Sequence, residues 1–288
     1  MSAIFKREFS SYMRNVTGPL FIALILMFEG ITCLVYNLVL SSPHFEYSLN
    51  YLQLVLIVAV PVLAMRSLAE DKRGRIDQLL YSLPMSLSRV VMGKYFAMLT
   101  VLSVPVLVMS FIPFVLSMYG TVNYFSTYVG FLYFLLLIAA MLSICMFMST
   151  VTESQVIAAV LGAGALIVCY FSVLLTSIVP KTESASLIAC IVISVLIAGI
   201  SYLFVKNYYV AIGVGAVLEA AVCIAYIIDS SVFLGLFGKM IDVIAIFDRF
   251  NLAVTSQMLD ITTVAYYLSV SVFFCFLTGT AVEKRRYS

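Results

Sequence analysis

Long uncharged apolar runs constrain the fold of this chain more than any other sequence feature. The run from 128 to 149, for example, contains no Asp, Glu, Lys or Arg. About 20 apolar residues in a helix cross a hydrocarbon core of roughly 30 Å. Inside lipid each backbone amide needs an internal partner, which a helix supplies, and the runs lack the alternation of lipid-facing barrel strands. The sequence therefore predicts an all-α polytopic membrane protein.

The composition agrees with this class, because 64% of the 288 residues are hydrophobic and only 10% are charged, whereas soluble domains carry about 25% charged residues. We predict one transmembrane domain over residues 1–288, since no linker, repeat or low-complexity segment interrupts it. The domain is expected to contain eight spans, near residues 17–40, 50–68, 95–118, 128–149, 155–178, 186–205, 209–228 and 264–282.

The lysines and arginines predict the orientation of these spans. With the N-terminus inside, 13 of the 16 basic residues fall on the inner face, and only Lys181, Lys239 and Arg249 fall on the outer face. Such a bias toward the cytoplasmic loops sets the topology of membrane proteins. We therefore expect a multi-pass protein of the cytoplasmic membrane with both termini in the cytoplasm. No basic stripe suggests a nucleic-acid partner.

Two segments outside the predicted spans are amphipathic if they are helical. In the first fifteen residues one face carries Ile4, Phe5, Phe9, Tyr12 and Met13, and the opposite face carries Arg7, Ser11 and Arg14. This pattern suits a helix lying in the cytoplasmic interface, and the alternative is a disordered basic leader. In the external stretch 229–263 one face carries Phe233, Phe237, Met240, Ile244 and Phe247. It predicts one helix on the outer leaflet, either a lid over an exit path or a surface anchor.

Motifs for chemistry within this chain are missing from its sequence. No GxxxxGK[ST] phosphate-binding loop occurs, and the glycine pairs Gly162/Gly164 and Gly213/Gly215 lie in apolar runs, where we expect small-residue contacts between helices. The single histidine, His44, has no ligand partners, and the cysteines lack metal-ligand spacing. The sequence predicts no enzyme activity, metal site or cofactor in this chain.

Two carboxylates are placed deep in predicted spans, Glu29 in the first and Glu219 in the seventh. An ionised side chain at that depth costs about 2.5 kcal/mol or more, so each should face protein or water, or be protonated. One interpretation is a proton or substrate contact along a pathway. The other is a neutral, hydrogen-bonded packing residue.

A polar segment, residues 66–94, separates the second and third predicted spans. Its charged residues Arg66, Glu70, Arg73 and Asp77 recur three or four positions apart, which stacks opposite charges on one helix face. They are followed by Leu79, Leu80, Leu83 and Pro84. Leucines on a charged cytoplasmic loop either fit a groove of a partner protein or rest in the lipid interface. The residues alone leave both interpretations open.

The stretch from Pro61 to Lys94 resembles the ABC-2 family of ATP-binding-cassette transporter permeases. Family members show a proline late in the second span, an acidic-basic-Gly cluster, an acidic-Leu-Leu run, a proline, and then Gly-Lys. The matching positions are Pro61, Glu70, Arg73, Gly74, Asp77, Leu79, Leu80, Pro84, Gly93 and Lys94. The N-terminal KREFSSYMRN is similar to the family's interfacial elbow helix. The final YYLSVSVFFCFLTGTAVEKRRYS is similar to the last span and basic tail of the gliding-motility and copper-processing permeases.

This resemblance implies a permease subunit of an exporter. The subunit would pair with a second identical or related permease and with two separate ATPase subunits, which bind ATP and Mg²⁺. The region from Glu70 to Pro84 would be the cytoplasmic coupling helix. The family plan has six spans, so the eight predicted here include an extra pair. Two other functions remain open: an ion-gradient-driven secondary transporter that uses Glu29 and Glu219, and a membrane assembly factor without transport activity.

Overall fold

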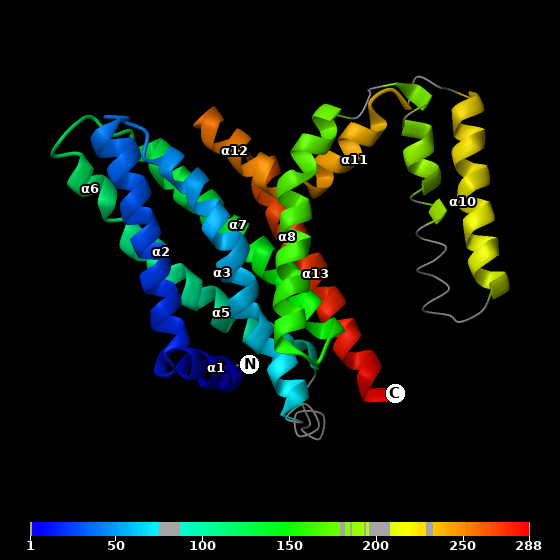
Figure 1. Cartoon of the computed structure of the whole chain (residues 1–288), viewed down its shortest axis with the longest axis horizontal. Coiled ribbons are helices and arrows are strands. Elements are labelled where there is room, and N and C mark those ends of the chain that lie inside the picture. Colours follow the sequence, from blue (N-terminus) through cyan, green and yellow to red (C-terminus); the bar gives the residue numbers. More distant parts are fainter. Residues whose placement is uncertain are drawn as a thin grey trace. The chain divides into compact units, whose positions relative to one another are not determined.

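The computed structural model describes residues 2–74, 87–178, 182–184, 186–192, 194–195, 208–228 and 233–287, and in these residues no strand occurs. The helical elements (Figure 1) are α1 (Ser2–Arg14), α2 (Thr17–Cys33), η1 (Leu34–Val39), α3 (Glu46–Arg73), α5 (Leu87–Met109), α6 (Ile112–Leu116), α7 (Tyr124–Val151), α8 (Gln155–Ile178), α10 (Tyr208–Ile228), α11 (Leu236–Ile244), α12 (Ile246–Ser256) and α13 (Ile261–Tyr287).

Within the described residues, six helical segments are long and apolar enough to cross a membrane. They are Thr17–Val39, Glu46–Ala69, Leu87–Leu116, Tyr124–Val151, Gln155–Ser172 and Ile261–Lys284. The predicted all-α, multi-pass membrane architecture is therefore confirmed. Their positions match six of the eight expected spans.

The remaining two expected spans are only partly described. The span expected near 209–228 coincides with helix α10, whereas most of the span expected near 186–205 lies outside the described residues. The total of eight spans stays a prediction.

The chain forms two compact units, one made of Met1–Val168 with Ile246–Ser288 and the other of Cys169–Ala245. Helix α7 is the centre of the first unit, where it packs on α3, α5, α12 and α13. Its side chains are apolar on all sides, which is the pattern of a helix surrounded by other helices. Tyr133, Phe134 and Leu137 are accordingly fully buried.

Polar side chains mark where two of these helices begin. Asn123 accepts a hydrogen bond from the backbone N–H of Ser126 at the start of α7. Asp260 accepts hydrogen bonds from the backbone N–H groups of Thr262 and Thr263 at the start of α13. Each side chain satisfies amides that have no partner within the helix, which favours a helix start at that residue.

The outer stretch 229–263 differs from the single helix that its apolar periodicity predicts. Two helices, α11 and α12, flank Ala245, whose backbone leaves the helical region at φ −76° and ψ 63°. Phe247, predicted to share a face with Ile244, is instead buried in the first unit, while Ile244 is half exposed. The prediction of one continuous helix is therefore wrong. The spacing of apolar side chains does not reveal a helix break at a single residue.

In the first unit, the N-terminus and the end of α13 lie at the same end of the helices, together with the end of α3 and the start of α5 (Figure 1). The short helix α6 lies at the opposite end of α5 (Figure 1). An arrangement with both termini on one side agrees with an even number of spans.

Candidate functional site

Lys94 is a buried charge at the end of the unit where α1, α3 and α5 meet. Helix α5 begins at Leu87, eight residues before the predicted start of the third span, so Lys94 lies inside the helix rather than at its mouth. Its side chain is only 2% exposed. A lysine is almost never fully buried unless it is paired. Hydropathy alone places the start of the third span after Lys94, because it does not show that the lysine charge is paired.

Two carboxylates and a backbone carbonyl surround the Lys94 ammonium group. Nζ lies 2.7 Å from Asp71 Oδ2 on α3 and 3.2 Å from Glu8 Oε1 on α1. It also donates a hydrogen bond of 2.8 Å to the carbonyl oxygen of Ser67. We call these residues, Glu8, Ser67, Asp71 and Lys94, the α1–α3–α5 junction. Charges that are paired and hydrogen-bonded in this way join the three helices at one point.

Helix α1 reaches the junction because it is amphipathic. Ile4 and Tyr12, predicted to share its apolar face, are buried, and Ile4 packs against Val90 of α5. On the solvent side, the Arg7 guanidinium donates a 2.7 Å hydrogen bond to the Glu8 carboxylate and stays 54% exposed. The predicted N-terminal helix is present, and its location in the membrane interface stays a prediction.

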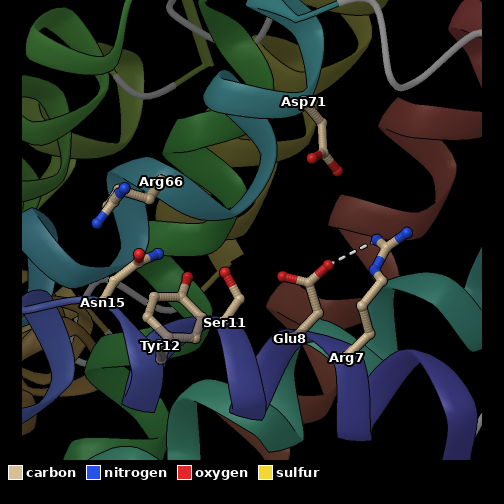
Figure 2. Close-up of a pocket in the computed structure, with 7 residues that line it drawn as sticks. All are labelled: Arg7, Glu8, Ser11, Tyr12, Asn15, Arg66 and Asp71. Carbon is tan, nitrogen blue, oxygen red and sulfur yellow. Dashed lines mark hydrogen bonds and ion pairs between the residues drawn. The ribbon is translucent and has the colours of Figure 1, made fainter.

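A polar cleft of about 290 Å³ opens beside the junction. Its lining comes from α1, from the linker that follows it and from α3, and consists of Arg7, Glu8, Ser11, Tyr12, Asn15, Arg66 and Asp71. Figure 2 shows Glu8, Ser11 and Tyr12 pointing from α1 toward the cleft, and Asp71 pointing into it from α3. The Arg66 guanidinium also donates a hydrogen bond to the Thr17 hydroxyl at the start of α2.

The two carboxyl groups of the junction have pKa values shifted in opposite directions. Burial raises the pKa of Glu8, but the positive charges of Lys94 and Arg7 outweigh it, so the Glu8 pKa lies below its ordinary value of 4.5. Burial also raises the pKa of Asp71 and here outweighs the opposing effect of Lys94, so the Asp71 pKa lies above 3.8. The surroundings of the junction therefore favour the ionised form of Glu8 and disfavour that of Asp71.

The end of α3 is also tied to α7. The Lys72 ammonium group donates hydrogen bonds to the carbonyl oxygens of Thr150 and Thr152, the latter at 3.5 Å. These carbonyls lie at the C-terminus of α7, where the last turn has no helical partners and a cation is favourable. A displacement of the end of α3 would therefore also displace α1, α5 and α7, to which it is bonded.

The predicted coupling residues lie around this junction to different extents. Glu70 and Arg73 belong to the last turn of α3, and Gly74 follows it. Gly93 is buried in α5 next to Lys94. The other coupling residues, Asp77, Leu79, Leu80, Leu83 and Pro84, lie outside the described residues. The structure therefore brings together the two ends of the polar segment, and the leucines keep the status of predictions.

The deep carboxylates Glu29 and Glu219 belong to different units. Glu29 is fully buried, and it accepts hydrogen bonds from the hydroxyls of Ser48, at 2.7 Å, and Thr32, at 3.2 Å. Ser48 is on α3, so this contact links α2 to α3. Glu219 is half-buried on α10. The partners of Glu29 are those expected of a hydrogen-bonded packing residue.

Another buried carboxylate, Glu46 at the start of α3, escaped the sequence analysis. It is 1% exposed and accepts hydrogen bonds from Ser126, at 2.7 Å, and Thr127, at 3.5 Å, on α7. His44 lies 3.2 Å from Glu46 and 3.2 Å from the Gln257 amide. Glu46 lies between the first two predicted spans, 17–40 and 50–68, and only contacts across the fold show that it is buried.

Glu8 also escaped the sequence analysis, although the sequence holds a signal for it. It is the only acidic residue in the first 28 positions, within an amphipathic segment that is otherwise basic. Such an isolated acid is a candidate for a specific cation partner. In the described part of the chain, no group of three or more His, Cys, Asp or Glu residues is arranged to hold a metal ion.

Comparisons with protein-family models, with curated proteins and with solved structures gave no match for this chain.

Proposed function

We propose that this chain is the membrane-spanning permease subunit of an ABC-2-type ATP-binding-cassette transporter, most simply an exporter. Separate ATPase subunits would dock on the polar segment, residues 66–94, from the cytoplasm. Two permease chains, identical or related, would form the membrane part. The likeness of the segment from Pro61 to Lys94 to family members supports this proposal, together with the geometry at its two ends.

The observation that carries the proposal is the position of Lys94 between Asp71 and Glu8. The polar segment leaves the membrane part at the end of α3 and returns at the start of α5, and the ion pair between Asp71 and Lys94 joins these two ends at 2.7 Å. A force applied to the intervening loop would therefore move α3 and α5 together rather than separating them. Glu8 adds α1 to the same group, and Lys72 adds α7.

This mechanism needs no chemistry within the membrane chain. ATP hydrolysis in the partner would change the spacing of the ATPase subunits, and the docked loops would transmit that change to the helices. Packed helices respond to such a displacement by moving as rigid bodies between discrete arrangements. The substrate would then gain access to the opposite side of the membrane.

The test is to place acidic side chains on the predicted docking leucines by the double substitution Leu79→Asp and Leu83→Asp. Charged groups in an apolar docking groove would be desolvated without partners, so the variant should no longer co-purify with a co-expressed ATPase from an adjacent reading frame. The matched control is Met118→Asp with Tyr119→Asp, two exposed residues in the loop before α7. It should retain the ATPase.

Full association of the Leu79/Leu83 variant with the ATPase would refute docking at these leucines. The same conclusion would follow if a membrane-impermeant reagent labelled Leu79→Cys from outside the cell. Loss of association in both variants would point to general misfolding, which the thermal melting temperature of each purified variant identifies.

A further inference from the structure

A second cavity, the α5–α13 groove, lies on the opposite side of α5 from most of the site described above. It has a volume of about 500 Å³ and is lined by residues of α5, α7 and α13. Most of its lining is apolar, including Leu99, Leu136, Val272 and Phe276. The Tyr95 hydroxyl, which also lines it, is already used in a 3.0 Å hydrogen bond to the Ala139 carbonyl. All three helices contribute candidate membrane spans, so the groove lies at the level of the hydrocarbon core.

Three polar residues of the lining lie at one end of this groove, whereas Tyr95 and Ser271 lie farther along α5 and α13. Ser88 is the second residue of α5, while Thr280 and Glu283 lie near the end of the last span. Because α5 starts and α13 ends at the same end of the unit (Figure 1), these three residues lie at the boundary of the apolar region. Among the described residues, Glu283 is the only charged one in the lining. The groove therefore has an apolar body and one acidic, hydrogen-bonding end.

The size of the groove favours a small amphiphile over a protein partner. Its volume falls within the range of about 300–1,000 Å³ that is typical of small-molecule sites. A partner helix, about 10–12 Å across with its side chains, is one of the outcomes that the experiment below distinguishes. Gly279 adds room inside the groove, since a Cβ atom placed on it would meet no atom within 4 Å.

We propose that the α5–α13 groove binds one acyl chain of a membrane amphiphile whose amino-bearing head group meets Glu283. The apolar lining would hold the chain by burial of its methylene groups. The carboxylate of Glu283 would accept hydrogen bonds from the ammonium group, with Ser88 and Thr280 beside it. This proposal rests on the membrane architecture and does not depend on the ABC-transporter assignment.

The experiment uses the full chain in lipid nanodiscs that contain phosphatidylethanolamine with a photoactivatable acyl chain. After irradiation, mass spectrometry locates the labelled peptides. We expect labelling of α5 and α13 residues that line the groove. Gly279→Leu should reduce this labelling to background, because the added side chain fills the open space. The matched control is Gly164→Leu on α8, where a Cβ also meets no atom within 4 Å but which lies outside the groove lining; it should label like the wild type.

A second pair of variants keeps the test valid if Gly279→Leu does not fold. Val272→Trp narrows the groove from its exposed edge, and Val168→Trp is the matched change at an exposed valine of α8. The head-group contact is tested with Glu283→Gln and with a phosphatidylglycerol probe that carries the same photoactivatable chain. The wild type should prefer the phosphatidylethanolamine probe, and Glu283→Gln should lose this preference.

Three results would overturn the proposal. Uniform labelling of all lipid-facing helices, unchanged by Gly279→Leu, would mean that the groove holds no more than the surrounding bilayer. Crosslinks between two copies of the chain through α13, abolished by Gly279→Leu, would make the groove a dimer interface. Equal labelling by the two probes in the wild type would overturn the role of Glu283. Because the readout is lipid labelling, a failure here is distinct from a failure to bind the ATPase.

Discussion

Lys94 shows how a single buried charge can organise the end of a helical membrane protein. The ammonium group is 2% exposed, and the partner carboxylates of Glu8 and Asp71 are 14% and 12% exposed. Removing one member of a buried ion pair is strongly destabilising, because the other member stays buried without a partner. We therefore expect substitution of Lys94 to destabilise the protein strongly, and substitution of an exposed partner to have little effect on its stability.

We predict that Lys94→Met lowers the free energy of unfolding by about 3–5 kcal/mol, since Glu8 and Asp71 would be left without their cation. Arg7→Gln is the control: it removes an exposed partner of Glu8 and should cost at most about 1 kcal/mol. The measurement is thermal or denaturant unfolding of the purified protein in detergent. A triple variant with Glu8→Gln, Asp71→Asn and Lys94→Met should recover part of the loss, and an unaltered melting temperature for Lys94→Met alone would contradict the assignment.

The opposite pKa shifts of Glu8 and Asp71 predict opposite effects of pH on stability. The lowered pKa of Glu8 gives a stabilising contribution that is fully present above 4.5 and is lost as the pH falls through the lowered value. The raised pKa of Asp71 gives a contribution that is present below 3.8 and is lost as the pH rises through the raised value. Glu8→Gln should therefore lose less stability than the wild type on acidification.

The measurement for this prediction is the melting temperature between about pH 6 and pH 3, where a group with a lowered pKa becomes protonated. The acid slope of Glu8→Gln should be shallower than that of the wild type. Asp71→Asn should become more stable relative to the wild type as the pH rises through the same range. An acid slope that is identical in Glu8→Gln and the wild type would show that Glu8 does not contribute.

At the scale of elements, two glycines of α8 show that contact with a neighbouring helix depends on the helix face on which a residue lies. The sequence predicts that Gly162 and Gly164 both serve as small-residue contacts between helices. Only Gly162 does so in the structure, since a Cβ there would lie 3.2 Å from Pro61 Cβ and 3.4 Å from Cys145 Sγ. At Gly164, and at Gly213 on α10, a Cβ would meet no atom of the described residues within 4 Å. Packing at Gly164 and Gly213 stays a prediction.

Gly162→Leu should therefore separate α8 from α3 and α7, with a loss of about 1–3 kcal/mol in the free energy of unfolding, as for other overpacked cores. Gly164→Leu adds the same side chain two positions away and should be neutral or slightly stabilising, because a helical glycine costs up to about 1 kcal/mol. Paired thermal unfolding of the two variants is the measurement. Equal destabilisation by both substitutions would contradict the claim that Gly162 is intolerant of a larger side chain because of its contacts with Pro61 and Cys145.

For the whole molecule, the arrangement of the first unit makes a prediction about topology. The N-terminal helix and the end of α13 lie at one end of this unit, and the loop between α6 and α7 lies at the other (Figure 1). With the charge bias of the sequence, the end with the termini is expected to face the cytoplasm. In the described residues, Cys33, Cys145, Cys169, Cys190 and Cys275 are all buried, so their background labelling should be low.

The test replaces exposed residues singly by cysteine and treats intact cells with a membrane-impermeant thiol reagent. Tyr119→Cys, in the loop between α6 and α7, should be labelled, because Tyr119 is 79% exposed. Val16→Cys, also 79% exposed, should be labelled only in inverted vesicles or after lysis. Labelling of Val16→Cys in intact cells would reverse the orientation and would place the polar segment out of reach of a cytoplasmic ATPase.

The sequence by itself determined the membrane class and most of the spans of this protein. A long uncharged apolar run has few alternatives to a helix across the bilayer, because lipid offers no partners to the backbone. The amphipathic pattern of the first fifteen residues likewise predicted a helix with Ile4 and Tyr12 on its buried face. Both are local properties, so they can be inferred from the order of apolar and polar residues along the chain.

Only the tertiary structure decided which polar groups meet. Lys94 pairs with Asp71 and Glu8, and Glu29 with Ser48, over separations that no spacing rule covers. Whether a charge is buried, and whether Gly162 or Gly164 faces a neighbour, depends on where other helices pass. Those positions are set by the packing of whole apolar surfaces, to which each residue contributes only a small part.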